Sequence, residues 1–216
     1  MMNQMDTIQQ AAKTANEKTI SSDTHITSRK KGFEYLNELF IKRHQKILWR
    51  STVKITAVCF ALVWGMLLAL CFVPEIRESA NELVLNWLPY FVFIMYTINR
   101  GRNFTRVLFM NCDHSLLTYS FYKQPGCILK LFRIRLREIM KINSLPAFVI
   151  GAGLCAILYA SGGAENLLNY VVLFVSILCM SLFFSIHYLT IYYLLQPYNA
   201  GTEMKSGMYQ VILSVT

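Results

Sequence analysis

The sequence predicts an all-α fold, a bundle of helices that crosses a membrane several times. Three observations predict it. Of the 216 residues, 55% are hydrophobic, and the mean hydropathy is +0.39. The apolar residues gather in long runs, whereas the net charge of +9 lies in the segments between them. As helices, the longer runs can cross a hydrocarbon core about 30 Å thick.

Four apolar segments are predicted to be full spans. They lie near residues 53–73, 83–98, 145–160 and 167–195. The first has one charged residue, Lys54 at its edge, the second contains Pro89, which predicts a kink, and the third opens with Pro146. The fourth is too long for the bilayer alone and must tilt or protrude. Residues 209–216 turn apolar again, which predicts the start of a fifth span or, alternatively, an interfacial helix.

Two polar regions precede the first span. Residues 1–31 are rich in Thr, Asn, Gln and Ser and have too few apolar side chains to offset the entropy of ordering, so a mobile tail is expected. Residues 32–50 mix apolar side chains with Lys and Arg, which predicts an amphipathic helix along the inner membrane surface before the chain turns inward. An ordinary basic anchor fits the same pattern. Residues 32–212 are then expected to form one transmembrane domain.

The distribution of charge predicts the orientation in the membrane. Residues 29–54 contain eight Lys and Arg against two acids, and residues 99–144 contain nine against two. Residues 74–82 and 161–166 together contain one against four. Both basic segments are therefore expected in the cytoplasm, with the N-terminus inside. Because the cations cluster beside the spans, we expect contact with the lipid bilayer and no binding of nucleic acid.

The basic segment 99–144 contains the most distinctive stretch of the chain. Asp113 precedes an apolar and aromatic run that ends at Pro125-Gly126, which predicts a helix of about two turns capped by Asp113. The run supplies side chains of the kind that anchor protein interfaces: Leu116, Leu117, Tyr119, Phe121 and Tyr122. This stretch is either a docking element for a soluble partner or a solvated loop that only fixes topology.

No motif in the chain predicts catalysis or metal binding. There is no phosphate-binding loop, nucleophile elbow or zinc-protease motif, so we expect no enzymatic activity and no cofactor in this chain. Cys112 and Cys127 flank the central stretch and are expected to be free thiols in the cytoplasm. His187, within the fourth predicted span, should face the bundle, either in an interhelical hydrogen bond or on a path for substrate or protons.

The whole arrangement resembles the ABC exporter permeases of bacteria, within the type-2 ABC exporter class. The resemblance covers about residues 32–212, and two motifs identify it: Asp113-x-x-Leu116-Leu117-x-x-x-Phe121-Tyr122 and His187-Tyr188-Leu189-x-x-Tyr192-Tyr193-Leu194-Leu195-Gln196-Pro197-Tyr198. It implies a membrane subunit of an ATP-driven exporter in the bacterial cytoplasmic membrane. Residues 113–121 would then be the coupling helix, which docks on a separate ATPase chain that binds ATP and Mg²⁺.

The same resemblance implies a second permease half or copy as a further partner. Such permeases have six or more spans in each half, so this chain would correspond to an N-terminal part. Two other functions fit the sequence. One is a stand-alone four-span interaction or regulatory protein whose basic loop binds lipid. The other, an intramembrane enzyme, would need a polar cluster around His187, which has no obvious charged partner at matching depth.

Overall fold

The computed structural model describes residues 29–113, 116, 119–164 and 166–196. Within these ranges the chain is helical and has no strand, which confirms the predicted all-α class. The chain divides into two compact units. Unit 1 contains the residues up to Arg50, residues 102–137 and those from Leu189 onward, and unit 2 contains residues 51–101 and 138–188.

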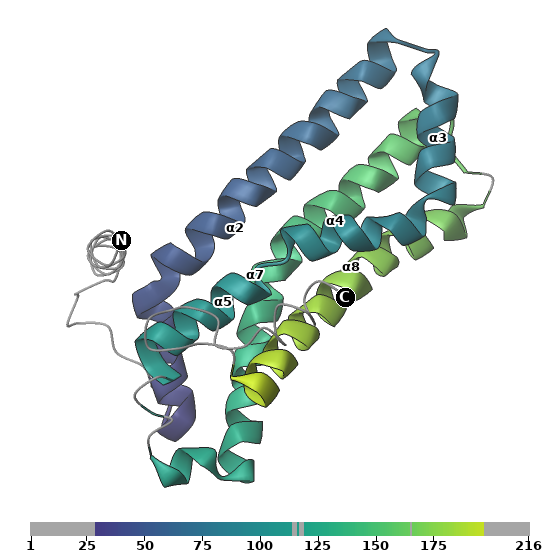
Figure 1. Cartoon of the computed structure of the whole chain (residues 1–216). Helices are drawn as coiled ribbons and strands as arrows, with labels where there is room; N and C mark the ends of the chain where they lie inside the picture. The colour runs from purple at the N-terminus through teal and green to yellow at the C-terminus, as the bar shows by residue number, and fades with distance from the viewer. Residues whose placement is uncertain (1–28, 114–115, 117–118, 165, 197–216) are drawn as a thin grey trace, which may run out of the picture. The chain divides into compact units, whose positions relative to one another are not determined.

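Among the residues that the structure describes, three helices are long and apolar enough to cross a membrane. They are α2 (Gly32–Phe72), α7 (Pro125–Ala160) and α8 (Leu167–Leu195), shown in Figure 1. The predicted spans at 53–73, 145–160 and 167–195 fall on these helices almost completely. The length and composition of the three helices therefore support a membrane protein.

The second predicted span, residues 83–98, is broken. It is made of α3 (Ile76–Asn86), the short 3-10 turn η1 (Leu88–Tyr90) and α4 (Phe91–Ile98). Pro89 has no N–H and cannot continue the helical ladder, so the predicted kink is a full break, which Figure 1 shows as a bend between α3 and α4. No single helix of spanning length forms in this part of the structure, and the count of four spans stays a prediction.

Helix α2 corrects the prediction of a separate interfacial helix. The chain does not turn between residues 32–50 and the first span, because α2 continues without interruption to Phe72. No Gly or Pro occurs from Phe33 to Trp64, so nothing ends the helix there. The 41 residues of α2 make a rod about 60 Å long, roughly twice the hydrocarbon thickness. The polar and the apolar residues of this stretch therefore belong to one helix.

Helix α7 likewise begins well before the third predicted span, at Pro125, and continues through it to Ala160. Pro146 lies inside α7 and does not begin a new helix. A proline removes one backbone donor, which leaves the carbonyl groups of the preceding turn less well paired. In that turn the carbonyl of Asn143 accepts a hydrogen bond of 3.2 Å from Ser181 Oγ, and the Asn143 side chain donates to Ser185 Oγ at 2.9 Å. Side chains of α8 thus stabilise α7 at its proline.

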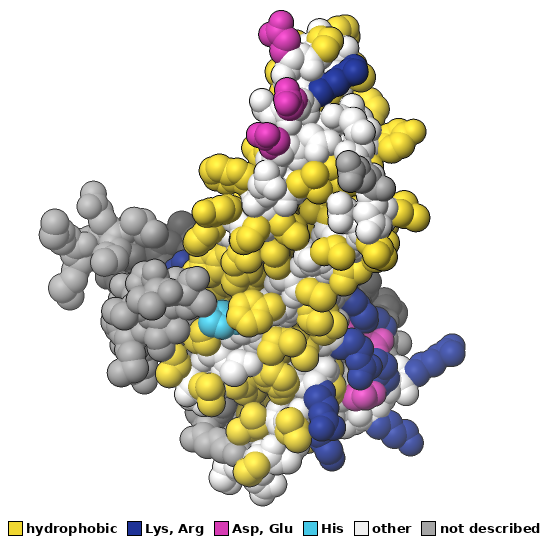
Figure 2. Space-filling model, turned by 90° about the vertical axis from the view of Figure 1, so that its right-hand side faces the viewer, with side chains coloured by type: hydrophobic (Ala, Val, Ile, Leu, Met, Phe, Trp, Pro, Cys, Tyr) yellow, Lys and Arg dark blue, Asp and Glu magenta, His cyan; other side chains and the backbone are white. Residues whose placement is uncertain are grey.

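Glycines allow close packing in unit 2. A Cβ atom added at Gly153 would lie 2.6 Å from the side chain of Val63, so α7 approaches α2 closely at this point. At the end of α7, Asn81 of α3 donates a hydrogen bond of 2.9 Å to the carbonyl of Gly163. Large apolar side chains of α2 remain exposed, among them Val58, Phe60, Leu62, Trp64 and Phe72. Figure 2 shows hydrophobic side chains over much of the visible face, as expected of a surface that lipid covers.

The two units differ in charge. Among the described residues, unit 1 contains 14 Lys and Arg against three acids, whereas unit 2 contains four against four. Most of the predicted mobile tail (residues 1–28) and the predicted start of a fifth span (residues 209–216) lie outside the described residues. Both stay predictions, as does the single domain over residues 32–212.

Candidate docking segment and buried ionic network

The candidate site lies in unit 1, where the chain passes from α5 (Gly101–Leu108) to α7. Helix α5 is strongly amphipathic: Phe104, Val107 and Leu108 are buried, whereas Arg102 and Arg106 are exposed. A π-helical turn, η2 (Phe109–Asp113), follows directly and is itself largely buried. The apolar face of α5 thereby brings Asp113 into the interior of the unit. The 3-10 turn η3 (Ser120–Lys123) then leads to α7.

Asp113 and Arg135 form a buried ion pair, with each residue 1% exposed. The guanidinium binds both carboxylate oxygens, and the contact from Nη1 to Oδ2 measures 2.7 Å. Two tyrosines donate to the same carboxylate, Tyr122 at 3.0 Å and Tyr192 at 2.6 Å. Paired, charge-assisted hydrogen bonds of this kind are among the strongest in proteins, and they offset the cost of burying two charges.

The other nitrogen contacts of Arg135 extend this network across the unit. Nε donates to Asn37 Oδ1 of α2 at 3.1 Å, Nη2 to the Tyr122 hydroxyl at 2.8 Å, and Nη1 to the Tyr193 hydroxyl. The guanidinium also lies 5.7 Å from the centre of the Tyr193 ring. We call these six residues the clamp: Asn37, Asp113, Tyr122, Arg135, Tyr192 and Tyr193. The clamp joins the segment around residues 113–122 to α2, α7 and α8.

Burial keeps the neutral groups around the clamp protonated. Burial raises the pKa of Tyr122, and Asp113 adds to this effect while Arg135 opposes it. Burial also raises the pKa of Cys112 to about 11, with a further contribution from Asp113. Tyr122 therefore remains a hydrogen-bond donor to Asp113 at neutral pH.

The structure divides the predicted docking residues into two groups. Asp113 and Tyr122 meet at the base of the segment, where Tyr122 is 2% exposed. Tyr119 is 56% exposed and Leu116 is half-buried. Leu117 and the side chain of Phe121 lie outside the described residues, as does most of the helix that Asp113 was predicted to cap. Docking by these residues stays a prediction, but Asp113 and Tyr122 are assigned to the interior.

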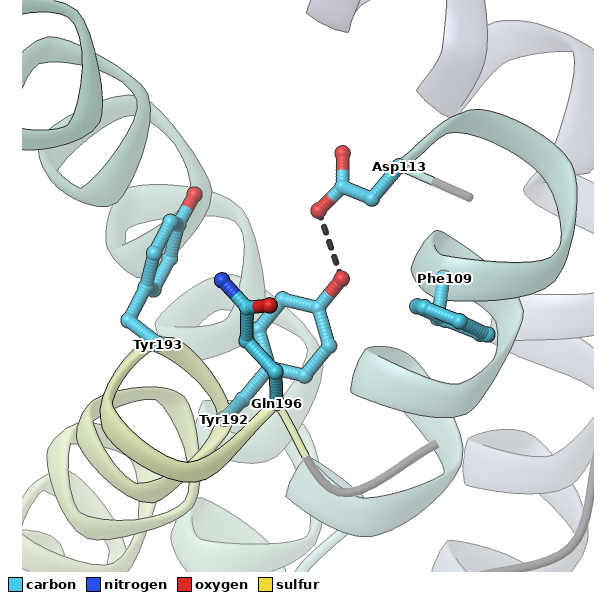
Figure 3. A pocket seen from close by; sticks show the side chains of 5 residues that line it. All are labelled: Phe109, Asp113, Tyr192, Tyr193 and Gln196. Atoms are coloured by element: carbon cyan, nitrogen blue, oxygen red, sulfur yellow. Dashed lines mark hydrogen bonds between the residues drawn. The ribbon is translucent and has the colours of Figure 1, made fainter. Parts of the chain in front are cut away.

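A small pocket lies beside the clamp. Five residues line it: Phe109, Asp113, Tyr192, Tyr193 and Gln196. Figure 3 shows these residues and the hydrogen bond that Tyr192 donates to Asp113. Its cavity volume is about 10 Å³, which is space for one water molecule at most and none for a transported substrate.

His187 is half-buried on α8, in unit 2, and its ring stacks on Phe183 with centroids 5.9 Å apart. Its buried Nε2 has no hydrogen-bond partner among the described residues, so the expected interhelical bond is not found at that nitrogen. A role of His187 on a substrate or proton path stays a prediction.

Arg135 is the central residue that sequence reasoning missed. Leu131, Arg135 and Ile139 are spaced four residues apart and are all buried, so Arg135 lies on the apolar face of α7. A cation at such a position predicts a buried acidic partner, and this signal was present in the sequence.

No protein-family model, curated protein or solved structure matches this chain. Any function must therefore be proposed from the geometry of the site and the pattern of the sequence.

Proposed function

We propose that this chain is the membrane-spanning permease subunit of an ATP-driven exporter, and that the segment between Asp113 and Tyr122 docks on a separate ATPase chain. The single observation that supports this proposal best is the clamp. It binds the two ends of the segment to each other and connects both to three long helices.

A soluble ATPase can move membrane helices only through a rigid connection. The hydrogen bond between Asp113 and Tyr122 closes the base of the segment, and Arg135 holds both residues. A displacement of the segment would therefore pass to α7 through Arg135 and to α8 through its two tyrosines. A loop that served only to fix topology would need no such buried connection.

The exposed part of the segment supplies the contact with the partner. Tyr119 presents a large aromatic side chain to solvent, and aromatic residues dominate the binding energy of many interfaces. The partner would bind ATP and Mg²⁺, whereas this chain would contribute only helices and the docking segment. The charge asymmetry supports an orientation in which unit 1 is cytoplasmic. The resemblance to bacterial exporter permeases implies the bacterial cytoplasmic membrane and a second permease half or copy as a partner.

Co-purification with the ATPase encoded by a neighbouring reading frame tests this proposal. Tyr119→Asp places a charge on the docking surface, and we expect it to reduce recovery of the ATPase about tenfold or more, because an interface anchor is lost and a charge must be desolvated. Tyr35→Asp is the matched control, since Tyr35 lies on α2 in the same unit and is 40% exposed. It should recover the ATPase as the wild type does.

Membrane abundance of each variant serves as the control for folding. Equal recovery of the ATPase with Tyr119→Asp and with Tyr35→Asp would contradict docking at this segment. If the wild-type chain recovered no ATPase at all, the exporter proposal would fail, and a stand-alone membrane interaction protein would be the better description.

A further inference from the structure

Two helices carry the same arrangement of cations just before their apolar parts. The spacing is i, i+3, i+7 and i+11 in both, and an isoleucine follows the last cation directly, Ile55 in α2 and Ile142 in α7. We call the two sets the cationic stripes: Arg43, Lys46, Arg50 and Lys54 in α2, and Lys130, Arg133, Arg137 and Lys141 in α7. All eight residues are exposed.

The spacing places each stripe on one side of its helix. The opposite side is buried at the same relative positions in both helices, one, five and nine residues after the first cation: His44, Leu48 and Thr52 in α2, and Leu131, Arg135 and Ile139 in α7. Both helices thus turn a buried face inward and a cationic face outward. Figure 2 shows several Lys and Arg side chains gathered in one group.

The chain itself offers these cations little countercharge. Of the eight stripe residues, Lys141 alone has an ion-pair partner in the described ranges, Glu138 at 2.8 Å. The acids described in unit 1, besides the buried Asp113, are Glu34 and Glu38, and Glu38 already binds Lys30 and Lys42. The stripes are therefore available to an external anionic partner.

Distance along the helix axis separates the stripes into two halves. At a rise of 1.5 Å per residue, the two outer cations lie about 10 and 15 Å before residue 53 in α2 and about 18 and 22 Å before residue 145 in α7, where the predicted spans begin; the inner cations lie within about 12 Å of these residues. The headgroup layer is only about 5 to 8 Å thick on each side of the hydrocarbon core. The inner half therefore lies at the headgroups or within a few ångströms of them, whereas the outer half lies beyond them.

The direction of the helices places the outer cations still farther from the bilayer. Both α2 and α7 run from their cationic part into their apolar part in the N-to-C direction. Side chains on a helix lean toward its N-terminus, so the outer cations lean away from the bilayer. At physiological salt, attraction to lipid phosphates is screened over about 8 Å. Lipid therefore accounts for the inner cations and leaves the outer ones to a partner in solution.

We propose that the outer half of each stripe is a docking surface for the acidic face of a soluble protein. The cations Arg43, Lys46, Lys130 and Arg133 would attract and orient that face, as complementary charges do at other interfaces. In the proposed function this partner is the ATPase, and only that identity depends on the proposed function. The acidic character of the partner follows from the stripes alone.

Two variants that each remove two Arg and two Lys test the inference. The outer variant combines Arg43→Gln, Lys46→Gln, Lys130→Gln and Arg133→Gln. The inner variant combines Arg50→Gln, Lys54→Gln, Arg137→Gln and Lys141→Gln. Both lower the net charge equally and change only exposed residues. The full-length chain is reconstituted in phosphatidylcholine nanodiscs, and binding of fluorescent poly-L-glutamate, used as the acidic probe, is measured by anisotropy at low and physiological salt.

The wild-type chain should bind the probe with an affinity that falls as salt rises. The outer variant should bind about tenfold more weakly, the combined effect expected of four exposed ion pairs, and the inner variant within about twofold of the wild type. Equal weakening in both variants would overturn the inference, because only net charge would then matter. A larger loss in the inner variant would also overturn it and would assign the stripes to the membrane surface. Because the ATPase takes no part, failure here leaves the exporter proposal standing.

Discussion

Replacing Arg135 with methionine should destabilise the protein far more than breaking an exposed ion pair. The change leaves the Asp113 carboxylate, 1% exposed, without its countercharge. Removing one partner of a buried pair typically costs about 3–5 kcal/mol, because the other charge stays buried and unpaired. The exposed pair between Lys42 and Glu38, at 2.9 Å, is expected to contribute less than about 0.5 kcal/mol.

These free energies translate into melting temperatures. For a protein of this length, each kcal/mol shifts Tm by about 2–4 °C. Arg135→Met is therefore predicted to lower Tm by about 6–20 °C, and Lys42→Met by less than about 2 °C. Lys42→Met is a matched control, since it also replaces a cation with methionine in an ion pair of unit 1.

Thermal unfolding of the purified chain in mild detergent measures both shifts. The double variant Asp113→Leu/Arg135→Met removes both charges, so it should be more stable than Arg135→Met alone, because no unpaired charge stays buried. A Tm for Arg135→Met within about 2 °C of that for Lys42→Met would refute the view that the clamp stabilises unit 1. If the double variant lost as much stability as Asp113→Leu and Arg135→Met lose together, that result would also refute it.

Three further predictions concern orientation, pH and packing. A variant that keeps Cys127 as its only cysteine should react with a membrane-impermeant maleimide only after permeabilisation, and labelling in intact cells would contradict the cytoplasmic placement of unit 1. Tm should fall as pH rises from 9 to 11, because an unfolded thiol ionises near 9.0 while Cys112 stays protonated to about 11. Cys112 contributes about 3 kcal/mol to this loss, and Cys112→Ala should remove that part while leaving the part due to buried Tyr122, whose pKa is also raised. Gly153→Ala should lower Tm, because overpacking against Val63 costs about 1–3 kcal/mol. Gly65→Ala is the control and should not lower Tm, since the space around Gly65 is open. Equal effects of the two variants would contradict the close approach of α7 and α2.

The helical class and the long apolar helices could be predicted from the sequence, because run length and composition determine them. Where helices stop was harder to predict. The amphipathic pattern at residues 32–50 shows which face of the helix is apolar, but it does not show whether the chain turns after residue 50. Only a helix breaker such as Gly or Pro would have predicted a turn there, and none occurs. Pro89 and Pro146 show the opposite difficulty: the first divides a predicted span, whereas the second lies within α7. The proline alone does not distinguish these outcomes, since neighbouring donors such as Ser181 decide them.

The candidate site was predicted only in part. Asp113 and Tyr122 were singled out as members of one stretch, but an aromatic run beside an acid looks the same whether it faces solvent or the interior. The burial of Asp113 depends on Arg135, 22 residues away, and on Tyr192, 79 residues away. No local pattern brings such distant residues together. The position of Arg135 on an apolar helix face was the one local signal of the clamp.

The claim that the clamp couples a docked ATPase to the helices is tested most directly by the ATP hydrolysis of the assembled complex in nanodiscs. Tyr122→Phe keeps the buried ring but removes the hydroxyl that donates to Asp113 at 3.0 Å and accepts from Arg135 at 2.8 Å. We predict that the ATPase still binds this variant within about twofold of its wild-type affinity, while stimulated hydrolysis falls about tenfold, since a hydrogen bond to a charged group is lost. Unchanged hydrolysis, or a loss of binding that accounts for all of the decrease, would contradict the claim.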